Sequence, residues 1–334
     1  MEGVLLEALG GHRTSRAARP VMELSALDNR ARFLQVNSIE KSTALGYATG
    51  ARDYISFCLN HKIPLNPTPA TLSRYIAYTS QFISSAPKYL TGARHFLADI
   101  YPEFDVNRAH PLVQATINGS KKSRADPVHR KLPLRPAHLD AFLQKARLTT
   151  NYDDFLFAVI LSCCFYGCHR TGELVIKSDK RLFDWRKVIK RSSLTFIAGR
   201  AGYHLPYHKA DRFYSGTDVL FIEQDVANPV QLLHEYVSRR DAIHGVHAAL
   251  FIREDGSLPN RSWFDTKFFA MLDRTYGGHS ARAGGATYYA SLGLPEDVIQ
   301  ALGRWSSQAW KIYIRDNPSV RAEYQLALLR LRIS

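Results

Sequence analysis

The stretch His279-Ser-Ala-Arg282, with Gly303-Arg-Trp305 and then Tyr313 behind it, decides which fold this chain can adopt. A histidine and an arginine three residues apart lie on one face of a helix. The arginine offers a planar fork that matches two oxygens of a phosphate, and the imidazole can share a proton with a third atom. A tyrosine hydroxyl brought to the same phosphorus would be a nucleophile. The combination favours phosphoryl transfer on nucleic acid without a metal, although a His-x-x-Arg pair alone is more often an ordinary helix surface.

Length and charge set the class of protein. The chain has 334 residues, of which 46% are hydrophobic, enough for two domains with proper cores. Its formal net charge of +14 is typical of proteins whose partner carries phosphates. No apolar run approaches the ~18–20 residues needed to span a membrane, and the first ten residues are too short and acidic for a secretory signal. We therefore expect a soluble, intracellular protein with no membrane partner.

The cysteines give no sign of a metal site. Three of the four fall in the apolar run 155–168, and no second Cys/His cluster has zinc-ligand spacing relative to them. His169 adjoins one of them, but a single pair does not make a site. We expect buried, reduced thiols, no metal and no cofactor. The cysteines are Cys58, Cys163, Cys164 and Cys168.

The N-terminal half predicts a helical bundle. Residues 1–35 mix Gly, Arg and Ser with little periodicity, so we expect a disordered basic arm, with order beginning near Ser38. Four short amphipathic helices follow within 36–120, and their outward lysines and arginines suit a DNA backbone or a solvated face. They are expected at 43–60, from Thr68-Pro69, from Pro87 with Ile100 facing inward, and from Pro111 to about Asn118.

A change of composition separates this bundle from the rest. The segment from Gly119 to Pro136 holds three prolines and seven basic side chains counting His129. We interpret 121–136 as an extended basic linker. A cationic linker between two basic domains suits a protein that closes around a duplex, and solubility is the alternative explanation.

The second domain, 137–334, is predicted to be mostly helical with a small antiparallel sheet, so the fold class is mainly α. The helix from Tyr152 to about Cys168 is apolar enough to be buried. The period then changes to that of strands, with Gly199–Gly202 as the first turn. Strands are expected at 193–198, 203–208 and 219–222, and helices at 137–148, 228–240, 261–276 and 279–291, from Leu294-Pro295, and around Tyr313.

Three motifs carry a family resemblance. They are Leu205-Pro-Tyr-His-Lys-Ala-Asp-Arg-Phe213, His279-Ser-Ala-Arg-Ala-Gly-Gly-Ala286 and Gly303-Arg-Trp-Ser-Ser-Gln-Ala-Trp-Lys-Ile-Tyr313. In this order, among these helices and strands, the chain resembles the tyrosine recombinase (phage-integrase-like) superfamily. It looks most like the eukaryotic, mobile-element-associated branch that is abundant in fungi. The resemblance covers about residues 36–320, with its specific motifs in the second half.

The resemblance implies an enzyme that cuts and rejoins DNA. It implies a SAM-like core-binding domain, a catalytic domain of the DNA breaking-rejoining fold, and site-specific recombination or integration through a 3′-phosphotyrosine, without ATP or metal. Double-stranded DNA would be the partner, and a homotetramer would form on synapsed DNA. The location would be the nucleus in a eukaryote, and otherwise the cytoplasm or nucleoid. A DNA-binding derivative that no longer cuts, and a type IB topoisomerase, are the alternatives.

The family's two arginines match Arg170, in the box Arg170-Thr-Gly-Glu-Leu174, and Arg282. They would clamp two non-bridging oxygens and neutralise the pentacoordinate phosphorane, with His279 beside them. Glu173 is expected to orient an arginine rather than to act in catalysis. The alternative is that Arg170 is an ordinary helix-end arginine paired with that glutamate.

Lys209 is the candidate for the family lysine, because an ammonium can protonate a leaving oxygen. Lys187 and Lys190 are nearby alternatives.

The family's His/Trp position and its nucleophile come last in the chain. Trp305 stands as expected relative to Arg282, but counting back from Tyr313 gives Arg304; we favour Trp305. Tyr313 is the expected nucleophile, because its basic neighbours favour a phenolate. Competing tyrosines are Tyr288, Tyr289 and Tyr324. The terminal segment 321–334 is amphipathic and would dock on a neighbouring protomer or on its own domain.

Overall fold

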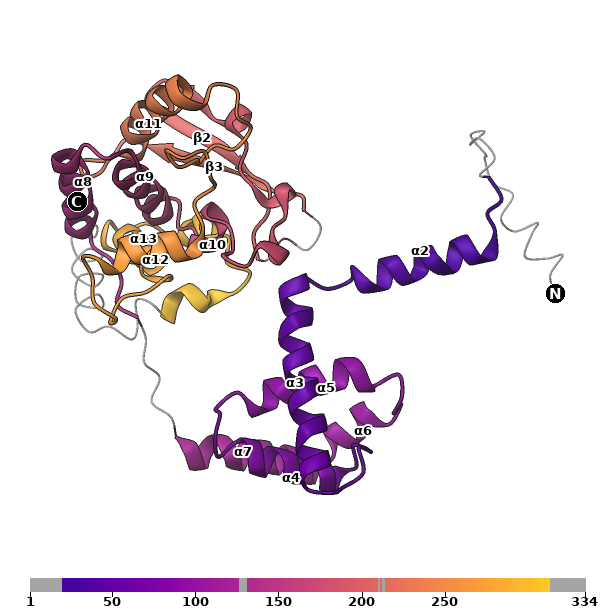
Figure 1. The fold of residues 1–334 in the computed structure, drawn as a ribbon. Coiled ribbons are helices and arrows are strands. Elements are labelled where there is room, and N and C mark those ends of the chain that lie inside the picture. The colour runs from indigo at the N-terminus through magenta and orange to yellow at the C-terminus, as the bar shows by residue number, and fades with distance from the viewer. Residues whose placement is uncertain (1–19, 126–130, 210, 212–213, 313–334) are drawn as a thin grey trace, which may run out of the picture. The chain divides into compact units, whose positions relative to one another are not determined.

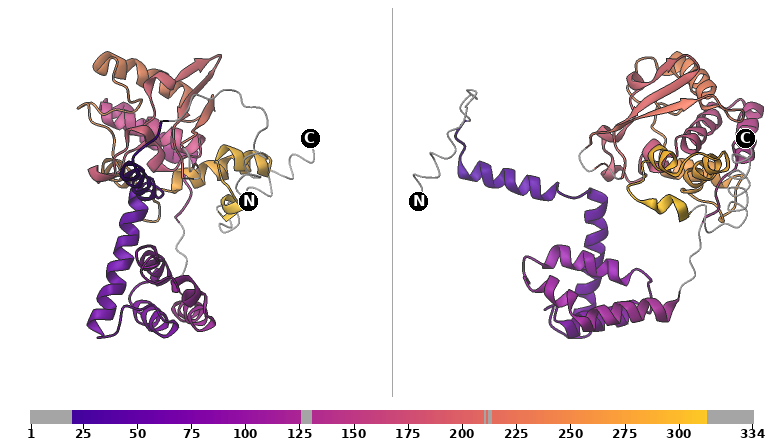
Figure 2. Two further views of the ribbon diagram at one scale, coloured as in Figure 1. Left: turned by 90° about the vertical axis from the view of Figure 1, so that its right-hand side faces the viewer. Right: turned by 180° about the vertical axis from the view of Figure 1, so that it is seen from behind.

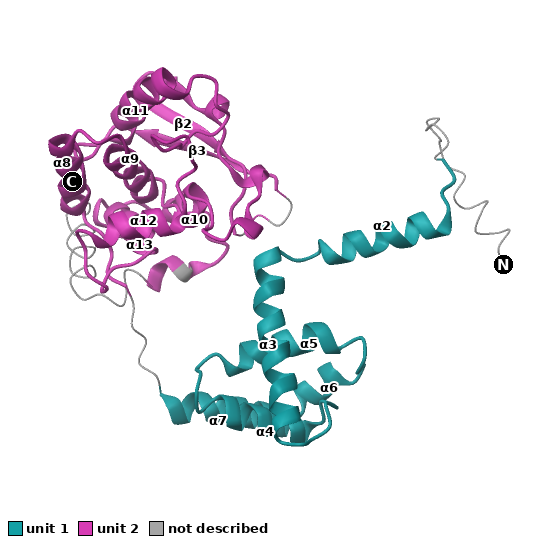
Figure 3. Ribbon diagram, viewed as in Figure 1, with its two compact units in different colours: residues 1–127 teal, residues 128–334 magenta. Residues whose placement is uncertain are grey.

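A computed structural model describes residues 20–125, 131–209, 211 and 214–312 of the chain (Figure 1). These residues form a mainly helical protein with a small three-stranded antiparallel sheet, as the sequence predicts. Contacts divide the chain into unit 1, Met1–Pro127, and unit 2, Val128–Ser334 (Figure 3). None of the helices within the described ranges is long and apolar enough to cross a membrane.

Unit 1 is a bundle whose core lies between α3, α4, α5 and α7. Helices α3 and α5 cross at two glycines, Gly50 and Gly92, where a Cβ would lie 2.4 and 2.5 Å from a carbonyl oxygen of the other helix. Helix α4 begins as predicted, because the Thr68 hydroxyl accepts from the backbone N–H of Thr71. The helices are α2 (Leu24–Val36), α3 (Lys41–Asn60), α4 (Pro69–Thr79), α5 (Ala86–Leu97), α6 (Phe104–Ala109) and α7 (Pro111–Arg124).

Unit 1 departs from the sequence prediction at its ends. Helix α2 lies almost wholly within the segment 1–35 that was predicted to be a disordered arm, ending one residue beyond it, and all of its residues are exposed. Good helix formers such as leucine, alanine, arginine and glutamine favour this helix without any packing. Helix α7 runs six residues past Asn118, so Lys121 and Lys122 belong to a helix and not to an extended linker.

Two smaller differences concern the end of α5 and the presence of α6. Ile100 was expected to face inward, but α5 ends at Leu97 and the side chain is 66% exposed. Helix α6 was not predicted, because its six residues are too few to show a helical period.

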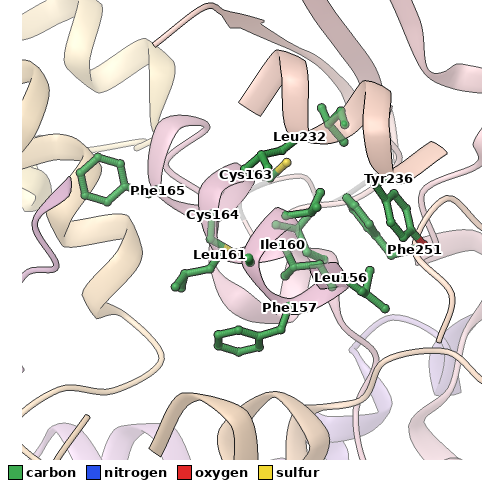
Figure 4. Packing of buried hydrophobic residues seen from close by; sticks show 14 of the residues in the cluster. Leu156, Phe157, Ile160, Leu161, Cys163, Cys164, Phe165, Leu232, Tyr236 and Phe251 are labelled. Atoms are coloured by element: carbon green, nitrogen blue, oxygen red, sulfur yellow. The ribbon is translucent and has the colours of Figure 1, made fainter. Parts of the chain in front are cut away.

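Unit 2 is built around α9 (Tyr152–Tyr166), in which 13 of 15 residues are buried. Figure 4 shows its side chains pointing outward in several directions, with Leu232 and Tyr236 of α11 against them. The prediction of a buried helix is confirmed, and so is the burial of all four cysteines. The other helices of unit 2 are α8 (Pro136–Thr149), α10 (Thr171–Leu174), α11 (Pro229–His244), α12 (Arg261–Phe269), α13 (Ser280–Ser291) and α14 (Glu296–Leu302), with 3₁₀ turns η1 (Lys180–Leu182), η2 (Trp185–Lys187), η3 (Arg191–Ser193) and η4 (Gln308–Trp310).

The sheet comprises β1 (Thr195–Ile197), β2 (Arg200–Leu205) and β3 (Thr217–Ile222), in that order and antiparallel. Helix α11 lies along its inner face (Figure 2). The first turn is Ala198-Gly199, and both residues have positive φ, 42° and 75°, as a two-residue type I′ turn requires. The predicted turn at 199–202 is therefore wrong, and β2 begins three residues earlier than expected. Lys209 lies in the loop between β2 and β3.

The described part of the predicted linker packs on unit 2. The N–H of Leu132 donates to the carbonyl of Thr275 at 3.0 Å, and that of Leu134 donates to the carbonyl of Ser280 at 2.9 Å. Leu134 is fully buried. The Thr275 carbonyl is available because α12 ends at Phe269 and not near 276, whereas Ser280 is the first residue of α13. Residues 131–135 therefore brace the start of α13.

Candidate active site

The turn after α9 places Arg170 at the rim of the site. Arg170 precedes the single-turn helix α10, and Glu173 accepts from its backbone N–H at 3.2 Å and from its Nη1 at 3.0 Å. The Arg170 side chain is 25% exposed, whereas that of Glu173 is 5% exposed. The carboxylate thus fixes the arginine, which fits both the supporting role and the simpler helix-end pair predicted for it.

Small residues on α13 bring Arg282 to this turn. A Cβ on Gly285 would lie 2.0 Å from the Phe165 carbonyl oxygen, so only glycine lets α13 approach α9 this closely. Arg282 Nη1 then donates to the carbonyl of Cys168 at 2.6 Å, and its Nη2 donates to the carbonyl of Gly303. The residue is 1% exposed.

His279, directly before α13, faces the cations of the site. The Thr171 hydroxyl donates to the carbonyl of Gly278 at 2.9 Å and so ties α10 to the turn before this histidine. His279 lies at the surface, but partial burial lowers the pKa of its imidazole, and nearby positive charges lower it further. A neutral imidazole follows, one that can accept a proton. The cations whose charges lower this pKa are Arg170, Arg282, Arg261 and Lys209.

The site carries excess positive charge. Burial first, and then the charge of Arg170, lower the pKa of Arg282 to about 10. Burial would raise the pKa of Glu173, but the hydrogen bond from His169 and the nearby arginine charges outweigh it and hold that pKa below its usual value. In the part of the chain that the structure describes, Glu173 is the one carboxylate that accepts from Arg170 and Arg304, and Arg282 donates to none. Such a cluster favours an anionic ligand.

The two candidates for the His/Trp position point in different directions. Trp305 is buried and stacks on Arg282, whose Cζ lies 4.1 Å from the indole centroid. Arg304 turns inward, with its Nη2 3.3 Å from Glu173 Oε2 and 3.2 Å from the carbonyl of Gly167. Trp305 therefore accompanies a predicted phosphate ligand, and Arg304 does not.

Of the three candidate lysines, Lys209 is exposed and its charge reaches His279. Lys187 Nζ lies over the ring of Tyr207, 4.3 Å from its centroid. Lys190 donates to the carbonyl of Trp185 at 2.9 Å, and burial lowers its pKa, which suits a proton donor. Lys209 is therefore the lysine whose charge acts on His279, and Lys190 is the chemical alternative.

The predicted nucleophile Tyr313 lies outside the described residues, as do Tyr324 and the segment 321–334. Of its competitors, Tyr289 donates to the carbonyl of Tyr166 at 2.8 Å, and burial raises its pKa. Tyr288 donates to Gln224 Oε1 at 3.0 Å, and burial raises its pKa too. Both hydroxyls thus donate hydrogen bonds within unit 2.

Sequence reasoning missed three side chains of this region. His169 is fully buried, and burial and the Arg304 charge lower its pKa to about 4. Arg261 lies over Gly278, where a Cβ would come 2.3 Å from its Nη2. His208 has a buried Nδ1 for which the described residues supply no partner. His169 could have been found from its place beside Arg170, whereas Arg261 carries no local signal.

Within the described ranges, no group of three or more His, Cys, Asp or Glu side chains is placed to hold a metal ion.

No protein-family model matches the chain, and no curated protein does. Similar solved structures are recombinases and integrases. The XerH site-specific recombinase bound to its difH substrate is 14% identical over 74% of this chain and 66% of that chain, with a TM-score of 0.47. XerA recombinase gives 16% identity over 87% and 93%, with a TM-score of 0.43, and a lambda integrase dimer bound to a core site gives 14% over 88% and 95%, with a TM-score of 0.49. Likeness at this level assigns no residue role to this chain.

Proposed function

We propose that this protein is a site-specific DNA recombinase or integrase that cleaves and rejoins DNA through a 3′-phosphotyrosine. One observation supports the proposal: in the described part of unit 2 the charges of Arg170, Arg282 and Lys209 act on His279, and of these cations only Arg170 donates to a carboxylate, that of Glu173. These three cations and the histidine are the residues that the motifs select. The net charge of +14 supports double-stranded DNA as the partner.

In this mechanism, Tyr313 Oη attacks the scissile phosphorus, a tyrosyl–phosphate bond forms and the bond to the 5′ oxygen breaks. Lys209 donates a proton to that leaving oxygen. Arg170 and Arg282 stabilise the charge on the non-bridging oxygens, and the neutral His279 takes up the proton that the Tyr313 hydroxyl loses as it attacks. Because the ester conserves the bond energy, rejoining by a 5′ hydroxyl needs no ATP, and the arginines supply the charge that a metal would otherwise give.

Access to Arg282 is the step that the geometry constrains most. The residue is 1% exposed, and its guanidinium stacks on Trp305 and donates two N–H groups to carbonyl oxygens. A guanidinium has five N–H donors, so others remain for a phosphate. Productive DNA binding therefore requires movement of the groups that cover Arg282, Trp305 among them.

Other aspects of the proposal rest on the sequence motifs alone. They are membership of the eukaryotic, mobile-element-associated branch, assembly of a tetramer on synapsed DNA, and a nuclear location if the source is eukaryotic.

The deciding experiment traps the covalent intermediate on a nicked suicide duplex from which the 5′ strand is lost after cleavage. We expect a protein–DNA adduct that resists denaturation, survives excess chelator, and maps to Tyr313 by mass spectrometry. Tyr313→Phe removes only the hydroxyl, so it should abolish the adduct and leave DNA affinity unchanged. An adduct on another tyrosine would show that the nucleophile is misassigned.

Two other outcomes correspond to the alternative functions. Relaxation of supercoils without any site preference would indicate a type IB topoisomerase. Tight binding with no adduct on any substrate would indicate a DNA-binding protein that has lost the reaction.

A further inference from the structure

Arg304 occupies an unusual backbone position. It follows Gly303 at the end of α14, and its φ of 55° lies in the left-handed region that normally favours glycine. Its N–H donates to the carbonyl of Ala301 at 2.9 Å, and the N–H of Trp305 donates to that of Gln300 at 3.1 Å, which closes the helix. Gly303 is needed beside it, because a Cβ there would overlap the Trp305 ring. Arg304 therefore ends α14 in a backbone conformation that glycine usually adopts.

The Arg304 guanidinium is enclosed by the turn that leads into α10. Its Nη2 lies 3.2 Å from the carbonyl oxygen of Gly167, 3.4 Å from that of Cys168 and 3.3 Å from Glu173 Oε2, and Nη1 donates to the carbonyl of Leu302 at 3.1 Å. The side chain is 8% exposed. Arg304 thus joins the end of α14 to the turn that carries Arg170.

The proton on His169 can be assigned from its neighbours. Its Nδ1 is 3.1 Å from Glu173 Oε2, and its Nε2 is 2.9 Å from the hydroxyl of Tyr203. An ionised carboxylate only accepts, so Nδ1 carries the proton and Nε2 accepts from the tyrosine. Arg304 Nη2 lies 3.2 Å from this protonated Nδ1, so its own N–H groups are directed to Glu173 and the carbonyl of Gly167 instead. Glu173 therefore accepts from His169, from Arg304, and from both the backbone and the side chain of Arg170.

We propose that Arg304 is a positioning residue. It holds the end of α14, nine residues before Tyr313, against Glu173 and so fixes this turn relative to Arg170. We call the contact between Arg304 and Glu173 the clasp. The inference deepens the proposed function and rests on it for its catalytic part. Counting back from Tyr313 placed Arg304 where a direct phosphate donor would stand, but its buried contacts assign it to the protein interior. Trp305, which stacks on Arg282, remains the candidate for that donor.

The first test separates a clasp from a phosphate ligand. Arg304→Met should slow adduct formation on the suicide duplex by about 10²-fold, the effect of a small misplacement of reacting groups. The dependence of DNA affinity on salt should not change, because Arg304 touches no phosphate. A salt slope lowered by about 1, the effect expected of a lost phosphate contact, or an unchanged adduct rate, would overturn the clasp.

The second test uses pH, which separates positioning from loss of stability. Positive charge from Arg304 holds the pKa of Glu173 down, so removing it raises that pKa. Adduct formation by Arg304→Met should therefore fail at a higher pH on the acid side than the wild type, and Arg304→Lys, which keeps the charge, should restore the wild-type acid limb. The same acid limb in both variants would contradict the clasp. Groups that face Glu173 are Arg170 and His169 from its own turn, Arg282 from α13, Cys164 from α9, Tyr203 from β2, and His208 after β2.

A matched control is available in unit 2. Arg253 pairs with Asp153 at 2.9 Å and is also partly buried, away from the site. Arg253→Met should lower the unfolding temperature without moving the acid limb. If Arg304→Met does not fold, Arg304→Lys alone gives the test: a slower adduct rate with an unmoved acid limb and salt slope supports the clasp, and a wild-type rate overturns it.

Failure of the proposed function would be recognised separately. If the wild-type protein forms no adduct, the clasp can still be judged by the NMR titration of His169, whose pKa Arg304 lowers. In Arg304→Lys that titration should match the wild type, and in Arg304→Met it should move to higher pH. An unmoved His169 titration in Arg304→Met would overturn the contact itself.

Discussion

The two arginines predicted to clamp one phosphate lie in opposite surroundings. Arg170 is partly exposed and already shares its charge with Glu173 at 3.0 Å. Arg282 is almost fully buried, donates to two carbonyl oxygens, and has a pKa lowered to about 10 by burial and then by Arg170. A buried cation without a carboxylate gains most from an incoming anion. If the proposed mechanism holds, we therefore expect Arg282, rather than Arg170, to provide most of the stabilisation for an anionic transition state.

The largest expected effect on the rate follows from this difference between the two arginines. Arg282→Ala should slow adduct formation at saturating DNA by about 10³–10⁵-fold, as removal of an arginine does in other phosphoryl transfers. Arg170→Ala should cost about 10²–10³-fold, the range for one donor to a developing oxyanion. Initial rates on the suicide duplex measure both. Equal effects, or a larger effect at Arg170, would contradict the assignment of the buried arginine.

Folding must be controlled in this experiment, because Arg282→Ala leaves the carbonyls of Cys168 and Gly303 without their donor. Arg282→Lys keeps the charge but not the planar fork. Its rate should fall between those of the wild type and Arg282→Ala, while urea unfolding shows whether the fold is intact.

The next prediction concerns Lys209, the proposed proton donor. If it protonates the leaving oxygen, Lys209→Ala should slow cleavage by about 10²–10⁴-fold. A substrate with sulfur in place of the bridging 5′ oxygen has a leaving group that needs no proton. Lys209→Ala should recover most of its rate on that substrate, while Arg282→Ala should stay slow.

The result also decides between the lysines. If Lys209→Ala and Arg282→Ala remain equally slow on the sulfur substrate, Lys209 is not the acid. Lys190→Ala should then show the recovery, because burial lowers the pKa of Lys190 and makes it a better donor.

The parts of the fold that follow a local period could be predicted from sequence. Helices α3 and α4 have apolar residues at helical spacing, and the Thr68-Pro69 start is a local signal that the structure confirms. The Ala198-Gly199 turn was missed, because the neighbouring Gly-Arg-Ala-Gly sequence resembles a turn more strongly. Helix α2 was missed because only helix propensity favours it, and none of its residues is buried.

Part of the candidate site could likewise be predicted from sequence, and part could not. The motifs select Arg170, His279 and Arg282, and the structure brings them together because Gly285 lets α13 approach α9. The inward turn of Arg304 could not be predicted, because it depends on a left-handed backbone angle and on a partner 131 residues away. Residue type and spacing contain neither quantity.

The buried half of the site also predicts acid sensitivity of the fold. His169 has a folded-state pKa of about 4, against 6.5 for an unperturbed histidine. Since its folded pKa is depressed, its contribution to stability is complete above pH 6.5 and is lost as pH falls toward 4. Urea unfolding should show roughly 2 kcal/mol less stability at pH 5 than at pH 7 from this group.

His169→Gln is the matched variant, because it retains a donor for Glu173 but cannot take up a proton. Its stability should vary less between pH 7 and pH 5 than that of the wild type. An equal loss of stability in both proteins would mean that a group other than His169 titrates between pH 7 and pH 5.

The smallest effect concerns DNA contacts outside the site, and it separates groups that bind DNA from groups that act on its phosphate. Lys121 and Lys122 lie exposed in the last turn of α7, whereas the amine of Lys131 donates to the carbonyl of Arg274. Each neutralised phosphate releases about 0.9 of a counterion on duplex DNA. Replacing Lys121 and Lys122 by Ala should therefore lower the slope of log affinity against log salt by up to about 1.8. Lys131→Ala should leave it unchanged, and neither change should alter the rate of adduct formation at saturating DNA. If Lys131→Ala lowers the slope instead, the brace against unit 2 opens on DNA and the linker segment itself contacts the duplex.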